Sequence, residues 1–232
     1  MQIHGLQKLT LLDYPGHTAA TIFTGGCNFR CPYCHNSELV LQPEKMPMIS
    51  EEELFKFLNL RAKVLDGIAI TGGEPTLQPD LPEFIAKVRA LGYKIKLDTN
   101  GQSPAMLEKL LKANMLDYVA MDIKNCRERY GDTIGIRDFR TDAVEASVNL
   151  LLHCGIHYEF RTTVATELHD TEAMASIGKW IAGARHYFLQ PYRDSDNVMV
   201  KGRFHAPEPD TLRTWKELLA KTIPLVDLRG VE

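Results

Sequence analysis

Short apolar runs rich in β-branched residues alternate along this chain with longer amphipathic segments. Parallel strands need helical crossovers, so this alternation predicts a parallel β/α fold. Ser50 and Glu53 form a capping box, which predicts a helix start. Six runs read as strands, at 19–26, 67–73, 93–101, 116–124, 156–164 and 186–192. Six segments read as helices, at 50–62, 81–91, 104–114, 141–154, 170–182 and 209–222.

The strand count and the chain length together predict the architecture. A closed eight-unit barrel takes about 250 residues, and this chain has 232 residues. Six β/α units with right-handed crossovers therefore predict an α/β fold built as a partial (β/α)6 TIM-like barrel. We expect this barrel over residues 1–192. Residues 193–232 are expected to form a C-terminal loop and a helix packed on the same domain.

Composition narrows the class of protein. Hydrophobic residues make up 44% and charged residues 25%, which is ordinary for a soluble globular chain. The net charge of −3 gives no sign of binding to nucleic acid or to an anionic membrane. No run approaches the roughly 20 apolar residues of a membrane span, and the first residues lack a secretory pattern. We therefore expect a cytoplasmic protein with reduced thiols.

The chemically unusual residues follow the predicted strands. In parallel α/β folds the carboxyl ends of the strands form the active face, so these segments are expected to converge. They are the cysteine segment 27–34, the glycine pair with Glu74 and Pro75 at 72–75, the turn 98–101, the segment 122–124, Arg161 and the segment 190–192.

Three of the five cysteines lie within eight residues with the spacing C-x3-C-x2-C: Cys27, Cys31 and Cys34. Three reduced structural cysteines, or a zinc site completed by Cys126 or His35, are the simpler interpretations. Iron–sulfur clusters are usually held by four thiolates. Three thiolates would leave one iron of a [4Fe–4S] cluster open to a small molecule, and the sequence favours this interpretation.

With Tyr33 before Cys34, this cysteine motif resembles that of the radical S-adenosylmethionine (radical SAM) superfamily. The run GGEP at 72–75 is similar to the superfamily motif that receives the SAM amino group. The resemblance implies one [4Fe–4S] cluster per subunit on Cys27, Cys31 and Cys34, with SAM at the open iron. It also implies a partial barrel fold and one-electron cleavage of SAM to methionine and a 5′-deoxyadenosyl radical.

A narrower resemblance is to the activating enzymes of glycyl radical enzymes. It is carried by YPGHTAATIFTGGCNFRCPYCHN at 14–36, DTNG at 98–101 and MDIK at 121–124. The leader GLQKLTLLDYPG is most like the branch that activates anaerobic ribonucleoside-triphosphate reductase. The resemblance implies that the radical abstracts a glycine Cα hydrogen from this partner. It further implies flavodoxin or ferredoxin as electron donor, and no catalytic side chain beyond the cluster.

The candidate SAM-binding residues carry groups suited to the ligand. Glycine lets backbone approach a ligand closely, Glu74 offers an acceptor for the ammonium, and Lys124 offers a cation for the carboxylate. The resemblance also implies a monovalent cation site near Asp98, Thr99 and Asp122. Turn chemistry at 98–101 and internal salt bridges at Lys124 and Arg161 remain alternatives. The full set is Tyr33, Gly72, Gly73, Glu74, Asp98, Thr99, Asn100, Asp122, Lys124 and Arg161.

The segment after the sixth predicted strand departs from the activating enzymes. It reads LQPYRD, with Arg193 where those enzymes often carry a histidine, so Gln190 and Tyr192 are only candidates for a ligand contact. The polar loop 193–207 is expected to border the barrel mouth and to contact the partner's glycine loop, helped by Arg161. A plain surface connection is the alternative.

Two other functions remain open from the sequence. One is a radical SAM enzyme that acts on a small molecule such as a pterin-derived carboxylate. The other is an electron-transfer or iron–sulfur sensor protein, which requires a fourth cluster ligand and no SAM pocket.

Overall fold

The computed structural model describes residues 1–230. Its strands are β1 (Ile3–Thr10), β2 (Ala19–Thr24), β3 (Gly67–Gly72), β4 (Lys94–Thr99), β5 (Tyr118–Asp122), β6 (His157–Val164), β7 (His186–Pro191) and β8 (Leu225–Leu228). Its helices are α1 (Ser37–Leu41), α2 (Glu51–Arg61), α3 (Leu81–Ala90), α4 (Pro104–Lys112), α5 (Tyr130–Ile134), α6 (Asp142–Leu152), α7 (Thr171–Trp180) and α8 (Pro209–Leu219).

All six predicted strands and all six predicted helices are present, and the chain is mixed α/β with a mostly parallel sheet. The strands follow chain order from β1 to β8. The first pair, β1 with β2, is antiparallel, whereas β2–β3, β3–β4, β6–β7 and β7–β8 are parallel. No helix within residues 1–230 has the length and hydropathy needed to cross a bilayer.

The sequence did not predict β1 and β8. Strand β1 is half-exposed along most of its length, with only its two end residues buried, so it lacks the apolar run that marks the parallel strands. Strand β8 has four residues, of which one is buried. Helices α1 and α5 have five residues each, which is too short for a helical period to be visible.

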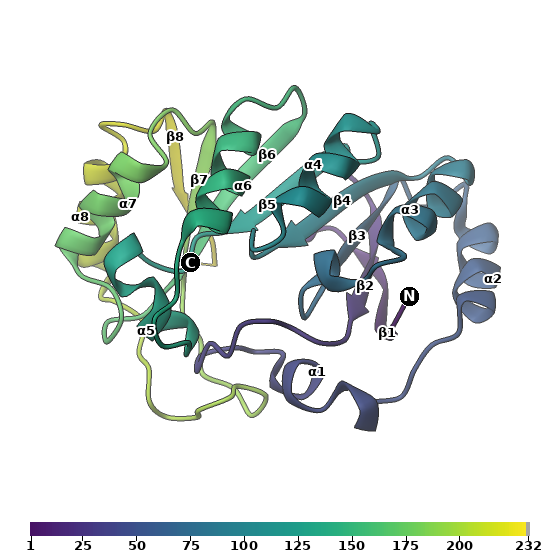
Figure 1. Cartoon of the computed structure of the whole chain (residues 1–232), viewed down its shortest axis with the longest axis horizontal. Coiled ribbons are helices and arrows are strands. Elements are labelled where there is room, and N and C mark those ends of the chain that lie inside the picture. The colour runs from purple at the N-terminus through teal and green to yellow at the C-terminus, as the bar shows by residue number, and fades with distance from the viewer. Residues whose placement is uncertain (231–232) are drawn as a thin grey trace. The chain divides into compact units, whose positions relative to one another are not determined.

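The chain divides into two compact units. The first unit comprises residues 1–28, 38–120 and 155–157. Its parallel strands carry fully buried apolar side chains, among them Ile22, Ile70 and Leu97, and helix α3 packs on β4 (Figure 1). Helix α2 starts at the predicted cap, because the Ser50 side chain accepts the Glu53 backbone N–H at 3.1 Å.

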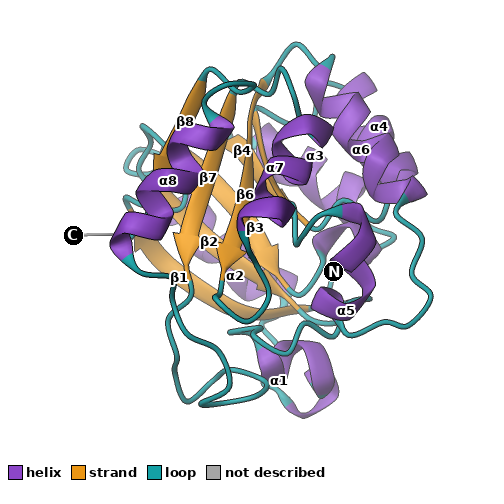
Figure 2. Ribbon diagram, turned by 90° about the vertical axis from the view of Figure 1, so that its left-hand side faces the viewer, coloured by secondary structure: helices purple, strands orange, loops and turns teal. Residues whose placement is uncertain are grey.

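The second unit comprises residues 29–37, 121–154 and the described residues from 158 onward. Helices α7 and α8 pack on each other, and α8 also packs on β8 (Figure 2). Arg229, just after β8, makes a bidentate ion pair with the buried Glu159 of β6, at 2.7 and 3.0 Å. The expected division of the chain at residue 192 stays a prediction, and residues 231–232 of its second part lie outside the described residues.

Candidate functional site

In the first unit, parallel pairing aligns the carboxyl ends of three strands. Thr24 of β2 is in register with Gly72 of β3, and β3 pairs with β4 in the same direction. The segments that follow these strands therefore meet at one edge of the sheet. These are the segment with Cys27, the loop with Gly73 and Glu74, and the turn with Asn100.

The glycine pair is required by backbone contact. A Cβ on Gly73 would lie 1.9 Å from the Gly26 carbonyl oxygen, and one on Gly72 would lie 2.4 Å from the Thr24 nitrogen. Gly72 also has a φ of +115°, which side-chain-bearing residues rarely adopt. The Glu74 N–H can then donate to the Gly26 carbonyl at 2.8 Å. Both glycines thus fix this loop against the segment that leads into Cys27.

The Glu74 carboxylate is buried and accepts four hydrogen bonds from the protein. Oε1 accepts from the Thr76 N–H at 3.1 Å, the Thr76 hydroxyl at 2.5 Å and the Thr99 hydroxyl at 2.7 Å, and Oε2 accepts from the Asn100 N–H at 2.6 Å. Burial raises the pKa of Glu74. Glu74 therefore ties the β3 loop to the β4 turn, and its predicted contact with the ligand ammonium stays a prediction.

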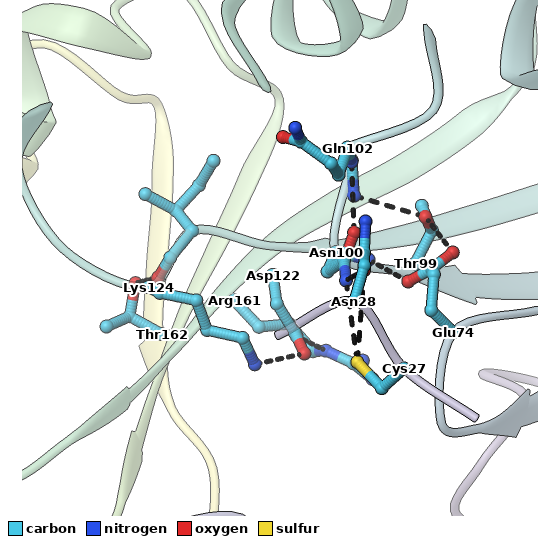
Figure 3. A network of polar contacts seen from close by, with 12 residues as sticks. Cys27, Asn28, Glu74, Thr99, Asn100, Gln102, Asp122, Lys124, Arg161 and Thr162 are labelled. Carbon is cyan, nitrogen blue, oxygen red and sulfur yellow. Dashed lines mark hydrogen bonds and ion pairs between the residues drawn. The ribbon is translucent and has the colours of Figure 1, made fainter. Parts of the chain in front are cut away.

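Two further polar residues of the first unit, Asn100 and Asp98, contact different groups. The Asn100 amide nitrogen lies 2.8 Å from Asn28 Oδ1 and 3.8 Å from Cys27 Sγ (Figure 3). Asp98 instead forms an ion pair with the buried Lys96 on the same strand. The predicted cation site near Asp98 stays a prediction.

In the second unit, Asp122 of β5 lies between two cations. Its Oδ2 is 2.8 Å from Lys124 Nζ, and its Oδ1 is 2.8 Å from Arg161 Nε (Figure 3). Burial raises the pKa of Asp122, but Arg161 and Lys124 outweigh burial and hold it below its usual range. Burial lowers the pKa of Lys124, and Asp122, Tyr33 and Cys31 together raise it well above its usual range. All three groups are therefore charged at neutral pH.

The internal salt bridge considered as an alternative for Lys124 and Arg161 is thus present. An ammonium group carries three N–H donors and a guanidinium group carries five, so the ion pair with Asp122 involves only part of each group. The predicted ligand contacts of Lys124 and Arg161 stay predictions. The structure adds that Asp122 sets the position of both.

The part of the cysteine segment that belongs to the second unit, with Cys31 and Cys34, is covered by the loop after β7. The Met199 N–H donates to the Cys34 carbonyl at 3.1 Å, and the Val200 N–H donates to the Pro32 carbonyl at 2.9 Å. The Phe204 ring packs edge-on to Tyr33, with centroids 6.1 Å apart. We call residues 193–207, which make these contacts, the cover loop.

Tyr33 lies between Cys31 and Cys34 in the sequence, and its side chain is buried. Its hydroxyl has no hydrogen-bond partner in the described part of the chain. Burial raises the pKa of this hydroxyl well above its usual range. An unpartnered buried hydroxyl costs free energy, so it marks a position where a polar ligand group would be stabilised.

The predicted cluster ligands Cys27, Cys31 and Cys34 stay predictions. No disulfide joins the five cysteines, all of which lie in the described residues. Among residues 1–230, no three histidine, cysteine or acidic side chains converge on a position for one metal ion. Cys126 is buried, and burial raises the pKa of its thiol, which agrees with an inert role.

Several residues of this site were not predicted. Thr76 and Gln102 act through local hydrogen bonds, and Asn28 acts through a bond to Asn100 across the fold. None of these bonds has a sequence signature, although each residue lies one or two positions from a predicted residue. Phe204 is far from the cysteines in sequence. Its aromatic side chain in a polar loop was the one available signal.

The second unit also holds a cavity of about 690 Å³ that includes no predicted site residue. It lies after β6 and beside the start of α8, where His205 of the cover loop pairs with Glu167 at 2.7 Å. Trp215 closes one wall, with its indole N–H donating to Thr171 at 3.1 Å. The cavity is thus bordered by the end of the cover loop.

Comparison with known proteins identifies the family. The model of the radical SAM superfamily matches residues 21–177, which include the cysteine motif and the glycine pair. This chain belongs to the radical SAM superfamily. The predicted radical SAM class and the partial TIM-like barrel that accompanies it are therefore confirmed.

Two similar relatives carry the name of one group of enzymes, the activating enzymes of glycyl radical enzymes. A protein of Methanocaldococcus jannaschii named as a glycyl-radical enzyme activating enzyme is 30% identical over 99% of this chain and 96% of its own length. The pyruvate formate-lyase-activating enzyme of Clostridium pasteurianum is 28% identical over 82% of each chain. The chain is thus an enzyme of the glycyl-radical activating kind, as the motifs predicted.

Solved structures agree on the fold. The crystal structure of Streptococcus suis SuiB bound to precursor peptide SuiA superposes with a TM-score of 0.71. It matches 91% of this chain and 48% of its own, at 14% identity. At that identity the likeness concerns the fold alone.

Proposed function

We propose that this radical SAM protein makes a glycyl radical on anaerobic ribonucleoside-triphosphate reductase. Cys27, Cys31 and Cys34 hold one [4Fe–4S] cluster, which, when bound, supplies the electron that cleaves SAM. The observation that carries the proposal is the match to a protein named as an activating enzyme, over 99% of this chain and 96% of the relative. The leader GLQKLTLLDYPG supports the choice of partner.

The chain's own residues bind and orient SAM. Lys124 and Arg161 offer cationic donors to the methionyl carboxylate, held in place by Asp122 at 2.8 Å from each. The glycine pair lets the loop after β3 pack against the backbone at Gly26 and Thr24, and we place the SAM amino group at this loop. Glu74, Thr99 and Asn100 hold this backbone, and Tyr33 adds a buried hydroxyl.

The surface of the cover loop is suited to contact with a peptide of the partner. It is anchored through buried Val198 and Phe204, while the charged side chains of Asp196, Lys201 and Arg203 remain exposed. Such a loop offers a fixed, charged surface next to the cysteine segment. We place the partner's glycine loop against it. Flavodoxin or ferredoxin supplies the electron, a monovalent cation binds near Asp98, and the protein works in the cytoplasm.

The test is anaerobic reconstitution with iron and sulfide, reduction, and addition of SAM. We expect one four-iron cluster per chain and release of methionine and 5′-deoxyadenosine. Cys31→Ala should lose the cluster, because two thiolates do not hold it, and Cys126→Ala should keep it. Full iron in Cys31→Ala, or loss in Cys126→Ala, would contradict the ligand assignment.

A further inference from the structure

The side chain of Asn100 points at the sulfur of Cys27. Asn100 follows β4 and Cys27 follows β2, so the two residues are brought together by the fold and not by sequence. The Asn100 amide nitrogen is 3.8 Å from Cys27 Sγ and 2.8 Å from Asn28 Oδ1 (Figure 3). Asn100 is buried, with 6% of its surface exposed, so water competes little for these bonds.

The hydrogen bonds decide which end of the amide faces the sulfur. The backbone N–H of Gln102 donates to Asn100 Oδ1 at 3.0 Å. An N–H group needs an acceptor, so this end of the amide must be the oxygen. The NH₂ group therefore faces Asn28 and Cys27. One of its two hydrogens is used by Asn28 Oδ1, and the other is available to the sulfur.

The backbone of Asn100 is held in place as well. Its N–H donates to Glu74 Oε2 at 2.6 Å, and the neighbouring Thr99 hydroxyl donates to Glu74 Oε1 at 2.7 Å. Glu74 is itself buried on the loop after β3. The amide is thus fixed at both ends before any ligand is present, so it can act on Cys27 without reorganising.

We propose that Asn100 is a positioning residue for Cys27, and that the hydrogen bond from the Asn100 side-chain N–H group to the Cys27 sulfur makes the cluster easier to reduce. This proposal rests on the proposed function, since it takes Cys27 as a cluster ligand. Reduction adds one negative charge, which spreads onto the ligand sulfurs. A hydrogen-bond donor beside a sulfur stabilises that charge, and such bonds are among the features that set cluster potentials. The role differs from the SAM contact predicted for Asn100.

The experiment is a redox titration of reconstituted protein, followed by electron paramagnetic resonance of the reduced cluster. Asn100→Leu removes the donor, and Asn100→Asp keeps the acceptor for Gln102 while turning an oxygen toward the sulfur. Asn100→Ser keeps a hydroxyl donor. Asn59→Asp, on the exposed face of α2, makes the same change of charge away from Cys27.

We expect Asn100→Leu and Asn100→Asp to shift the potential to more negative values. The ratio of reduced to oxidised cluster at a fixed potential should fall about tenfold, which is about 59 mV for one electron. Asn59→Asp should titrate like the unmodified protein, and Asn100→Ser should stay close to it. The proposal would be overturned if Asn100→Leu and Asn100→Asp bind a full cluster and its reduction potential is unchanged.

Loss of loading is also decisive. If the Leu and Asp variants take up no iron while Asn100→Ser loads and titrates normally, the donor is required and the proposal stands. If Asn100→Ser also fails to load, Asn100 serves the fold and the proposal falls. Failure of the unmodified protein to bind a cluster would instead overturn the proposed function, so the two failures are distinguishable.

Discussion

Gly73 shows how closely the ligand-binding loop is built against the chain before Cys27. A Cβ at this position would lie 1.9 Å from the Gly26 carbonyl oxygen, a distance that only backbone movement relieves. The GGEP motif thus reflects packing of the protein on itself as well as access for a ligand. The same loop carries Glu74, whose carboxylate accepts four hydrogen bonds and is thereby fixed.

We predict that Gly73→Ala lowers the free energy of unfolding by about 1–3 kcal/mol, the usual cost of an overpacked site. Urea unfolding of the protein without its cluster measures this. Gly155→Ala is the matched control, because a Cβ there meets no atom within 4 Å. It should change the free energy of unfolding by less than about 0.5 kcal/mol. Equal effects of the two substitutions would contradict this account of the loop.

Asp122 links the site to the pH dependence of stability. Arg161 and Lys124 hold its pKa below the usual value, so the ionised carboxylate stabilises the fold above about pH 4. This contribution is lost as the pH falls through the lowered pKa. Asp122→Asn should therefore be less stable than the unmodified protein at pH 7, with a difference that shrinks below about pH 4. Urea midpoints measured from pH 7 to pH 3 test this, and a difference that stays constant would refute it.

At the scale of elements, the cover loop is the feature with the clearest consequence. Its buried Phe204 packs on Tyr33 in the cysteine motif and on Tyr192 at the end of β7, with centroids 6.1 and 6.0 Å apart. Residues near the C-terminal end of the chain therefore hold the cysteine motif in place. Its polar composition predicted only a surface connection or a contact surface.

Phe204→Ala should destabilise the protein by about 3–5 kcal/mol, because it removes a buried ring. It should also speed the loss of visible absorbance when the reconstituted protein meets air, since the cysteine segment loses its cover. Val200→Ala, in the same loop but 36% exposed, keeps its backbone bond to Pro32 and is the control. Equal bleaching rates in the two variants would show that the ring does not protect the segment.

The parallel elements were predictable because buried strands and amphipathic helices leave long apolar periods in the sequence. Strand β1 could not be found this way, since pairing at an edge leaves most of its residues partly exposed. The site was predictable where motifs are contiguous, as at the cysteines and the glycine pair. Asn28 and Phe204 escaped because their roles arise from contacts across the fold, which spacing along the chain does not record.

At the scale of the whole molecule, we propose that the charged face of the cover loop contacts the partner enzyme. Charge reversal at Lys201 and Arg203 should lower the yield of glycyl radical while SAM cleavage continues without a partner. Both side chains are exposed, but Lys201 pairs with Asp196 and Arg203 lies 5.3 Å from the Phe204 ring centre, so urea unfolding of the variant checks that the loop stays folded. Lys63→Glu with Lys221→Glu, at exposed positions outside the loop, is the control pair. Undiminished radical yield in the loop variant would remove the loop from the partner interface.

The central claim is that this radical SAM enzyme makes a glycyl radical on a partner. The most direct measurement incubates the reduced, reconstituted protein with SAM and anaerobic ribonucleoside-triphosphate reductase, and records the electron paramagnetic resonance spectrum. The account predicts a glycyl doublet that requires SAM and disappears with Cys31→Ala. SAM cleavage without a doublet, for this reductase and for every other glycyl radical enzyme encoded beside it, would contradict the account.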